Sequence, residues 1–543
     1  MNLGLRYDLQ GPWSERFNRL SYFVPTATNF LTAFLPAGSS PIKGDVFLVD
    51  PSQRNNLPLD KTNFSPRVGF AYSIDAKTVV RSGYGIFWIP NYVSFALNPL
   101  NDMVNAGTTT YFGTVDGTHP VSTIALPFPA GISLPPGRSL GVQGTQQYLT
   151  QTVQSITEVD PRNHPNGYVQ QWNLNVEREL PSGFFVSAAY VGSKGTHLEQ
   201  YSQQINQISD AFLAQAAAEV NPSLPNPRQN VTLVQPAPNP FFVNGEALAL
   251  TGRTTTVGQL LRPYPQYTSV QLAGQGSYDS TYHSLQLTVN RRFANAGSLL
   301  VAYTNSKLIS DTDTLTSWLE TGVGGIQDNN NLRGERSLSS QDVPQRLVIS
   351  YVVDLPIGKG RKYLTNVQGT MDKLVTGWGV DGVTIFQRGF PLIFTNGQAN
   401  GTTLFGGGSR PNVVPGCNPV AQASATLRLG DANNSQMSKW FNAACFAAPP
   451  DFTFGDEPRV DPRLRAQGIS NFNFAVFKRT RFATNERFGL EFRTEFFNIF
   501  NRTQFAPPNT ICCTANNVNF GVVTATAPGT NPRLVQFGLK FLF

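Results

Sequence analysis

The sequence has 543 residues, and only 14% of them are charged, against about 25% in an average soluble domain. Phenylalanine, glycine and proline are abundant, with 39, 48 and 39 copies, whereas histidine and methionine number 4 each. Hydrophobic residues make up 40% of the chain, which excludes a disordered protein. The net charge of +7 is scattered along the sequence, so we expect no nucleic-acid binding.

The start of the chain resembles neither a signal peptide nor a membrane helix. No apolar run approaches the roughly 18 residues that a membrane-spanning helix needs. The first residues lack the basic and apolar regions of a signal peptide. Leu3, Leu5 and Tyr7 alternate with other residues, so the sequence is expected to open inside a β-strand. We therefore expect a portion of a longer protein, or a gene model that begins too late.

Apolar residues at every second position predict twelve β-strands. The strands are expected at residues 1–9, 66–75, 77–89, 167–180, 183–194, 281–294, 297–306, 344–355, 375–388, 470–482, 486–499 and 532–543. The clearest strand places Trp172, Leu174 and Val176 on one face and asparagine and glutamate side chains on the other.

Short and long connections alternate between these strands. The chain turns within a few residues after Ile74, Leu180, Phe293 and Phe482. The long connections span residues 10–65, 90–166, 195–280, 307–343, 389–469 and 500–531. Compact soluble domains have connections of about 4–6 residues, whereas outer-membrane barrels combine short periplasmic turns with long extracellular loops.

The predicted fold class is therefore all-β, an antiparallel transmembrane β-barrel. Its apolar strand faces would meet lipid, and its polar faces would line the lumen. A β-sandwich or a β-propeller is the alternative, but the polar strand faces would be poor in a sandwich core.

The last ten residues carry one unbroken apolar face. The residues of this apolar face alternate with Gln536, Gly538 and Lys540 on the opposite face. The apolar face consists of Val535, Phe537, Leu539, Phe541 and Phe543. We predict a lipid-facing terminal strand that runs to the end of the sequence.

The four cysteines lie in two of the long connections. Cys417 and Cys445 share the connection 389–469, and an exported protein meets oxidising conditions. We predict a disulfide between them, with two free thiols as the alternative. Cys512 and Cys513 are adjacent, and a vicinal bridge and two free thiols both remain open.

No catalytic, cofactor or metal site emerges from the sequence, and we expect no enzyme. The four histidines lie in or beside loops: His119, His164, His197 and His283. Asp311–Glu320 superficially resembles a calcium loop, but its fifth and sixth positions and the place of Glu320 do not fit. The basic stretch Gly358–Lys362 lacks the spacing of a phosphate-binding loop, so we interpret it as a solvated turn.

Several stretches resemble the barrel region of TonB-dependent outer-membrane receptors, in particular the Oar-like group common in acidobacteria. They are Asn63–Trp88, Tyr168–Leu198, Tyr282–Lys307, Arg346–Tyr363, Gly377–Leu392, Arg487–Phe505 and the terminal strand. The resemblance implies a place in the outer membrane of a Gram-negative bacterium and uptake of a nutrient or chelate. It also implies that the barrel-assembly machinery recognises the terminal aromatic strand.

The resemblance also sets expectations about domains and partners. Barrels of this receptor class have about 22 strands, so the resemblance implies that the twelve predicted strands are part of a larger barrel. Residues 1–543 are expected to form the C-terminal portion of that barrel, with the plug domain and the signal peptide absent from this chain. The implied partners are outer-membrane lipid and lipopolysaccharide, the TonB complex through a plug, and an unknown extracellular ligand. The alternative function is a structural or adhesion barrel that transports nothing.

No substrate-binding residue is predicted from the sequence. Leu260–Leu272 holds aromatic residues beside amides, which could stack on sugars or peptides or could simply pack within a loop. Loop packing is favoured for any single residue there.

Overall fold

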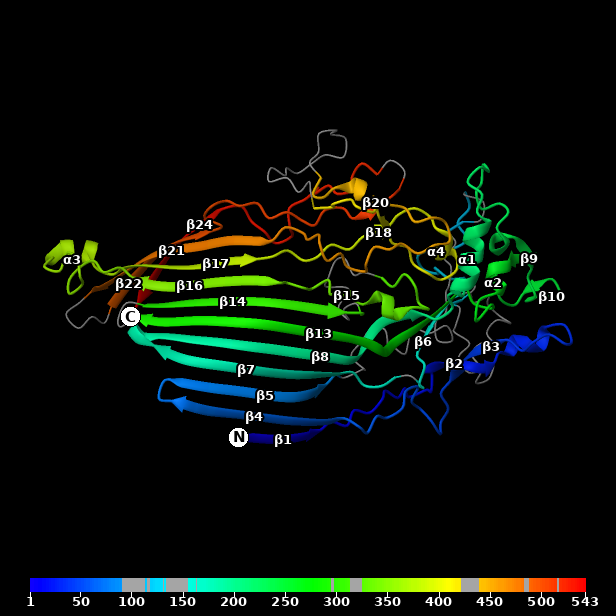
Figure 1. The fold of residues 1–543 in the computed structure, drawn as a ribbon, viewed down its shortest axis with the longest axis horizontal. Helices are drawn as coiled ribbons and strands as arrows, with labels where there is room; N and C mark the ends of the chain where they lie inside the picture. The colour runs from blue at the N-terminus through cyan, green and yellow to red at the C-terminus, as the bar shows by residue number, and fades with distance from the viewer. Residues whose placement is uncertain are drawn as a thin grey trace.

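One large antiparallel sheet dominates the structure (Figure 1). The computed structural model describes residues 1–89, 113–114, 118–129, 131–132, 155–162, 164–293, 297–312, 325–420, 439–482, 488–514 and 517–543. The path of the sheet is β1 (Asn2–Tyr7), β4 (Phe64–Asp75), β5 (Thr78–Trp88), β7 (Tyr168–Leu180), β8 (Phe184–Gln204), β13 (Ser269–Phe293), β14 (Gly297–Ser310), β16 (Gln345–Asp354), β17 (Trp378–Gln387), β21 (Ile469–Phe482), β22 (Phe488–Phe497) and β24 (Leu534–Leu542).

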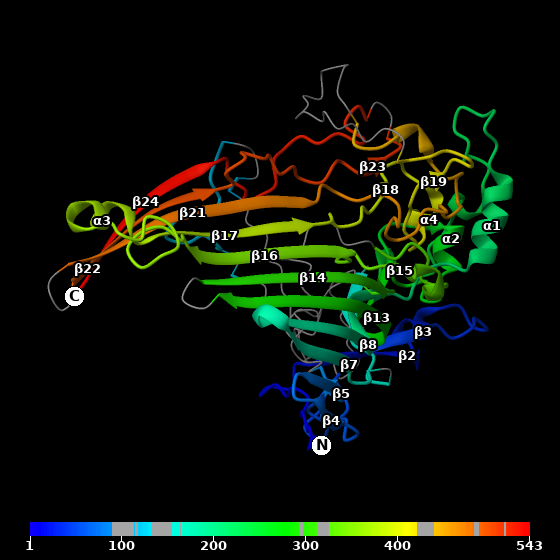
Figure 2. The ribbon, with the colours of Figure 1, turned by 60° about the vertical axis from the view of Figure 1, so that its left-hand side comes forward.

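These twelve strands confirm the twelve predicted ones, and they follow one another in the sheet in chain order. Two boundaries were wrong, because β8 runs to Gln204 and β13 begins at Ser269, so both extend far into the predicted loop 195–280. β6 (Ser155–Glu158) pairs with β13 in parallel, and β15 (Ser337–Leu338) pairs with β14. β1 and β24 form the two margins of the sheet, as Figure 2 shows from another side.

The two ends of the sheet differ in the way that the sequence predicts. β4 joins β5, and β7 joins β8, across two or three residues at one end, which we call the turn end. The predicted tight turns 294–296 and 483–487 lie outside the described residues. The turn end also carries α3 (Gly369–Val375), in the connection that contains Gly358–Lys362. Among the described helices, none is both long and apolar enough to cross a membrane.

The long connections gather at the opposite end, where they build a folded layer (Figures 1 and 2). We call the described parts of residues 8–63, 155–167, 205–268, 325–344, 388–468 and 498–533 the loop layer. Its helices are α1 (Asp210–Glu219), α2 (Val257–Leu260) and α4 (Gly401–Leu404). Its strands form small pairs: β2 (Ser21–Thr28) with β3 (Lys43–Leu48), β9 (Pro236–Pro238) with β12 (Thr254–Thr256), β10 (Phe242–Val243) with β11 (Glu246–Ala247), β18 (Thr395–Asn396) with β23 (Ile511–Cys512), and β19 (Asn412–Val413) with β20 (Phe446–Ala447).

The long connections are folded, because the loop layer holds the buried core of the protein. One hydrophobic cluster joins Phe23, Phe241 and Tyr267, which come from two different connections and are at most 2% exposed. A second cluster joins residues of 388–468 and 498–533, and a third joins 205–268 to 388–468. Since each cluster draws on distant segments, the connections fold against one another as a unit.

A glycine at a strained position permits the first of these clusters. Gly44 has a φ of 84°, which side-chain-bearing residues rarely adopt. A Cβ atom at this position would collide with the rings of Tyr264 and Phe23. The close approach of β3 to these two aromatic rings therefore requires glycine.

Candidate functional site

The strand register assigns the alternating residues of the sheet to two faces. Tyr303 stands opposite both Leu287 and Leu347, and Leu347 stands opposite Phe386. We call the face that these residues share the apolar face. Following the register across the sheet, it also contains Val68, Phe70, Tyr72, Leu174, Val176, Leu285, Val301, Ile349, Phe472, Phe474, Phe492 and Phe496.

The terminal residues predicted to face lipid belong to this apolar face. In the register, Val535 stands opposite Phe496, Phe537 opposite Thr494, and Leu539 opposite Phe492. Phe541 follows opposite Leu490, and Phe543 comes directly after β24 with 92% of its surface exposed. Phe537 and Leu539 are 69% and 70% exposed. A row of apolar side chains with this exposure needs an apolar medium around it.

The other face of the sheet, which we call the polar face, carries the acidic residues of the paired segments. On β17, β21 and β22 the charges form a network, in which Arg493 lies 2.9 Å from Asp381 and 3.2 Å from Glu495. Arg479 contacts Glu491 at 2.8 Å. On β5 and β7, Arg81 contacts Glu177 at 3.1 Å. Charged networks of this kind suit a wet lumen and not a hydrocarbon interior.

The structure brings Cys417 and Cys445 together in the second hydrophobic cluster. Their Cα atoms are 5.3 Å apart, within the usual range for a disulfide, and their sulfur atoms are placed as bonded partners. Cys512 and Cys513 are likewise placed as a vicinal pair. Cys445 is fully buried, and Cys417 packs against the same cluster.

We predict that non-reducing peptide mapping recovers Cys417 and Cys445 in one cross-linked peptide pair. Replacing both by alanine should destabilise the region around Phe394 and Phe441 by about 3 kcal/mol, since the bridge restrains the unfolded loop. Limited proteolysis of the purified protein measures the change. A variant with alanine at Cys512 and Cys513 is the control, and separately alkylated peptides for Cys417 and Cys445 would contradict the pairing.

The described histidines and the start of the calcium-like segment contact other parts of the protein and do not form a metal site within the described residues. His197 Nδ1 lies 3.0 Å from the Gly276 carbonyl oxygen, and His283 Nδ1 lies 2.8 Å from the Tyr190 hydroxyl. Burial lowers the pKa of His164 to about 4, so its ring is neutral near pH 7. Asp311 accepts a hydrogen bond from the Asp279 amide at 2.6 Å, and the rest of its segment from 313 to 320 lies outside the described residues. Within the described ranges, no three metal-ligating side chains gather into a group.

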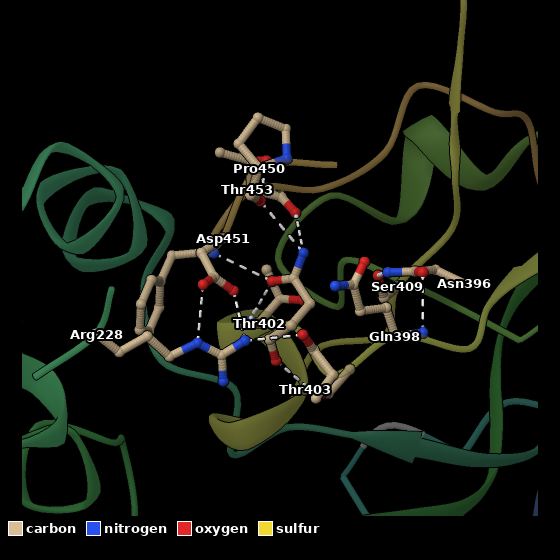
Figure 3. Close-up of polar contacts among 12 residues, drawn as sticks. Arg228, Asn396, Gln398, Thr402, Thr403, Ser409, Pro450, Asp451 and Thr453 are labelled. Carbon is tan, nitrogen blue, oxygen red and sulfur yellow. Dashed lines mark hydrogen bonds and ion pairs between the residues drawn. The ribbon is translucent and has the colours of Figure 1, made fainter. Parts of the chain in front are cut away.

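A polar network ties two long connections of the loop layer together (Figure 3). Arg228 forms an ion pair with Asp451 at 2.6 Å and donates a hydrogen bond to the Ala399 carbonyl oxygen at 2.8 Å. Asn400 accepts hydrogen bonds from the amides of Thr402 and Phe452, at 3.0 and 3.1 Å. The side-chain amide of Asn400 also donates to the carbonyl oxygens of residues 450 and 453. The surface of the loop layer is therefore fixed by side-chain contacts between connections.

A buried ion cluster joins a third connection, residues 325–344, to the other two. Glu335, in the connection 325–344, forms a short ion pair with Arg410, and their side chains are 2% and 6% exposed. Arg459 donates hydrogen bonds to the carbonyl oxygens of Glu335 and Ser310, at 3.1 and 2.7 Å. No sequence pattern identifies this cluster, because its members are far apart in the chain and follow no motif.

Glu457 lies in the same buried region, and its ionisation affects the loop layer. Burial, followed by the neighbouring Asp461 carboxylate, raises the pKa of Glu457 to about 9. Arg463, 3.4 Å away, lowers this pKa but does not cancel the effect of burial. At neutral pH the carboxyl group of Glu457 therefore holds a proton.

We predict that the stability of the loop layer falls as the pH rises. An unfolded glutamate has a pKa of about 4.3, so the folded layer binds a proton that the unfolded layer releases. This contribution is complete below about pH 4.3 and is lost as the pH rises towards 9. Thermal melting followed by near-ultraviolet circular dichroism should show the decline, and Glu457→Gln should flatten it. Glu246→Gln, at an exposed position, is the control, and a flat wild-type profile would rule out a buried protonated Glu457.

Comparison with known proteins identifies the family. A family model described as an outer membrane beta barrel domain matches residues 1–536. The chain belongs to the outer membrane beta barrel domain family. The protein is therefore a barrel domain of the outer membrane of a Gram-negative bacterium. Its apolar face is the lipid-facing surface, and its polar face lines the lumen.

Solved structures that resemble this outer membrane barrel are receptors and transporters. The outer membrane transporter YddB from Escherichia coli has a TM-score of 0.39 and 8% identity, with 92% of this chain and 43% of that chain covered. The ferric enterobactin receptor PfeA from Pseudomonas aeruginosa has a TM-score of 0.38 and 9% identity, over 92% and 44%. The ferripyoverdine receptor of the Pseudomonas aeruginosa outer membrane has a TM-score of 0.33 and 10% identity, over 92% and 35%. This chain thus spans less than half the length of each of them, and no curated protein matches it.

Proposed function

We propose that this outer membrane barrel belongs to a TonB-dependent receptor that carries a nutrient or a chelate into the periplasm. The loop layer would capture the substrate at the cell surface, and a plug domain within the barrel would couple release to TonB. The observation that carries the proposal is the folded loop layer at one end of the sheet. The sheet itself has one apolar face and one polar face.

Two features of the structure support transport. The ion pairs on the polar face, one at Arg81 and a network around Arg493, suit a lumen that holds water or a plug. The loop layer is cross-linked by the Arg228–Asp451 and Glu335–Arg410 pairs, so it can hold a binding surface in one shape. Preorganised surfaces bind ligands with a smaller loss of conformational entropy than mobile loops do.

The segment Leu260–Leu272 supports no direct role in substrate capture. Gln266 and Tyr267 have no exposed surface, and Arg262 is 7% exposed. The Gln266 side chain donates hydrogen bonds to the carbonyl oxygens of Lys43 and Gly44, at 2.9 and 3.0 Å. These three side chains therefore pack within the loop layer, and we expect a substrate to meet other residues.

The second candidate is a structural or adhesion barrel whose loop layer binds a partner and transports nothing. A rigid, folded loop layer favours this function as much as it favours substrate capture. The charged network on the lumen side favours transport, since an adhesive barrel gains nothing from it.

Gene deletion in the native organism tests the proposal. The deletion strain is grown on a panel of single iron and carbon sources, and the source on which growth fails is then followed as a labelled substrate. Transport predicts that uptake returns with the complete gene and disappears when a protonophore dissipates the proton-motive force. Normal growth on every source, together with loss of attachment to surfaces, would favour the adhesion barrel.

A further inference from the structure

A hollow lies in the sheet where β4, β5, β7, β8 and β13 are neighbours, and we call it the wall hollow. Its volume is about 430 Å³, which is within the range of small-molecule sites. It lies near the loop-layer end of these strands, since β5 ends at Trp88 and β7 begins at Tyr168. One row of cross-strand partners crosses it, consisting of Arg67, Gly85, Gln171, Ser193 and Tyr282.

The strand register places the wall hollow on the lumen side of the sheet. The row from Arg67 to Tyr282 is one residue out of step with Val68, which belongs to the apolar face, so its side chains lie on the polar face. Gly83 and Asn173, which also line the hollow, pair with each other two residues further along and share that face.

The row between these two, from Val68 to Gly192, also lines the wall hollow. Its side chains lie on the lipid side, so it contributes main-chain atoms to the floor. A hollow on the lipid side would instead be lined by the flanking apolar rows, but Phe70, Leu174 and Ile86 of those rows do not line it.

Two glycines of β5 form the floor of the wall hollow. Gly83 and Gly85 leave this part of the strand without side chains on the lumen side. A Cβ atom at Gly83 would lie 3.1 Å from Asn173 Oδ1, and one at Gly85 would lie 3.1 Å from the Phe87 ring. The side chains of Asn173 and Phe87 therefore lean over the glycines and form walls of the hollow.

One positive charge faces the wall hollow. Among the described residues that line it, Arg67 is the only charged one, and its side chain is exposed. Its guanidinium group lies 4.6 Å from the centroid of the Phe87 ring, which restrains its orientation. Asp8 pairs with Arg6 at 2.6 Å, and Glu177 pairs with Arg81 at 3.1 Å. In the part of the chain that the structure describes, no carboxylate pairs with Arg67.

The rest of the lining consists mostly of amide and hydroxyl groups. Gln171 and Asn173 are exposed, and Ser193 and Tyr282 are half-buried. Within the described ranges, these four side chains make no hydrogen bond to protein atoms. Their donors and acceptors are thus available to a ligand. Since most small-molecule sites are mainly apolar, this lining favours a ligand that carries many hydroxyl groups.

We propose that the wall hollow binds a polyhydroxylated carboxylate with one negative charge, which is the chemistry of a sugar acid. The carboxylate would meet the planar guanidinium group of Arg67, which suits bidentate contact, and the hydroxyl groups would meet Gln171 and Asn173. One unpaired arginine matches one carboxylate. A chelate with several ionised carboxylates would leave charges without partners in the hollow. This inference rests on the transport function proposed above and names the class of its substrate.

Saturation-transfer nuclear magnetic resonance measures the binding. The protein extracted from outer membranes in mild detergent is mixed with glucuronate, or with glucose as an uncharged analogue of similar size. Saturation should reach glucuronate, and glucose should bind at least tenfold more weakly. Arg67→Gln should weaken glucuronate binding about tenfold, which is the loss of a charge-assisted hydrogen bond. Gly83→Val fills the floor of the hollow and should abolish the binding.

Matched controls exclude general effects of the substitutions. Arg81→Gln removes a positive charge from the same strand and the same face, but this charge is paired with Glu177, so the affinity should be unchanged. Gly538→Val adds a side chain to the polar face of β24, where no atom lies within 4 Å, and should also leave the affinity unchanged. Heat-modifiable migration in gel electrophoresis confirms that each variant has folded.

Three results would overturn the proposal. Equal binding of glucose would exclude recognition of a carboxylate. Tighter binding of ferric citrate than of glucuronate would exclude a site for a single charge. Unchanged glucuronate binding in both Arg67→Gln and Gly83→Val would exclude the wall hollow as the site.

The binding measurement needs no proton-motive force, so it is independent of the transport test. Binding of glucuronate by a protein that supports no energy-dependent uptake would support the wall hollow and contradict transport. Energy-dependent uptake in cells, together with no saturation transfer to glucuronate, would overturn the wall hollow as a sugar-acid site and leave the transport function standing.

Discussion

Lysine in place of Leu539 is expected to destabilise the barrel by about 2–4 kcal/mol, whereas lysine in place of Gln536 should be nearly neutral. Both positions lie in β24, three residues apart, and they differ in the face that they occupy. Leu539 stands opposite Phe492, in the middle of β22, and is 70% exposed on the apolar face. A lysine there would place its ammonium group in hydrocarbon.

The polar face gives the opposite expectation at Gln536. Gln536 stands opposite Glu495, so a lysine there would face a carboxylate across the strands. The native sequence already has this arrangement four residues further along β24, where Lys540 stands opposite Glu491. A charge of the same sign is therefore compatible with this face of the terminal strand.

Unfolding of the protein from lipid vesicles in denaturant measures both variants. Heat-modifiable migration in gel electrophoresis confirms that each variant has folded before its stability is compared. Lysine at Phe537 should repeat the loss seen at Leu539, since Phe537 is also on the apolar face. Equal losses at Leu539 and Gln536 would contradict the division of the sheet into a lipid face and a lumen face.

Glu335→Ala is expected to destabilise the loop layer by about 3–5 kcal/mol without unfolding the sheet. The substitution leaves the guanidinium group of Arg410 buried without its carboxylate partner. Arg410 also donates a hydrogen bond to the Glu457 carbonyl oxygen at 3.3 Å, which does not compensate a full buried charge. The backbone amide of Gln327 also loses its hydrogen-bond acceptor, Glu335 Oε1.

Hydrogen exchange of the folded barrel measures this effect segment by segment. Protection should fall in residues 325–344 and 388–420 and should remain in β14, β16 and β17. Asp451→Asn is the matched control, because the Arg228–Asp451 pair also joins two connections but is 23% and 21% exposed. Asp451→Asn should lower the stability of the loop layer by roughly 1–2 kcal/mol. Unchanged protection in Glu335→Ala would show that the buried pair does not hold the connections together.

The sheet was predictable from the sequence because every strand that crosses lipid needs an apolar residue at alternate positions. That requirement located all twelve strands along the chain and, at β24, the face of each residue. The same rule failed for the outer parts of β8 and β13. The segment His197–Gln204 is mostly polar on both faces, and it lies beyond the end of β7, whose first residue Tyr168 pairs with Thr196.

The loop layer was not predictable because its partners are distant in sequence. Phe23 and Tyr267 meet in one cluster, and no local pattern connects two residues so far apart. The Glu335–Arg410 pair follows no motif either, and only its burial distinguishes it from a surface ion pair. The cysteines were an exception, since two of them in one long connection of an exported protein already suggested a pairing.

The location of the buried core also divides the protein between two solvents. The clusters around Phe23, Phe394 and Phe405 are shielded from water by other loop residues, while the apolar residues of β4, β22 and β24 are exposed on the sheet. Calorimetric melting of the loop layer should therefore show the large heat-capacity change of a water-soluble domain. Its midpoint should be insensitive to the chain length of the surrounding detergent, whereas the unfolding of the sheet should follow that chain length closely.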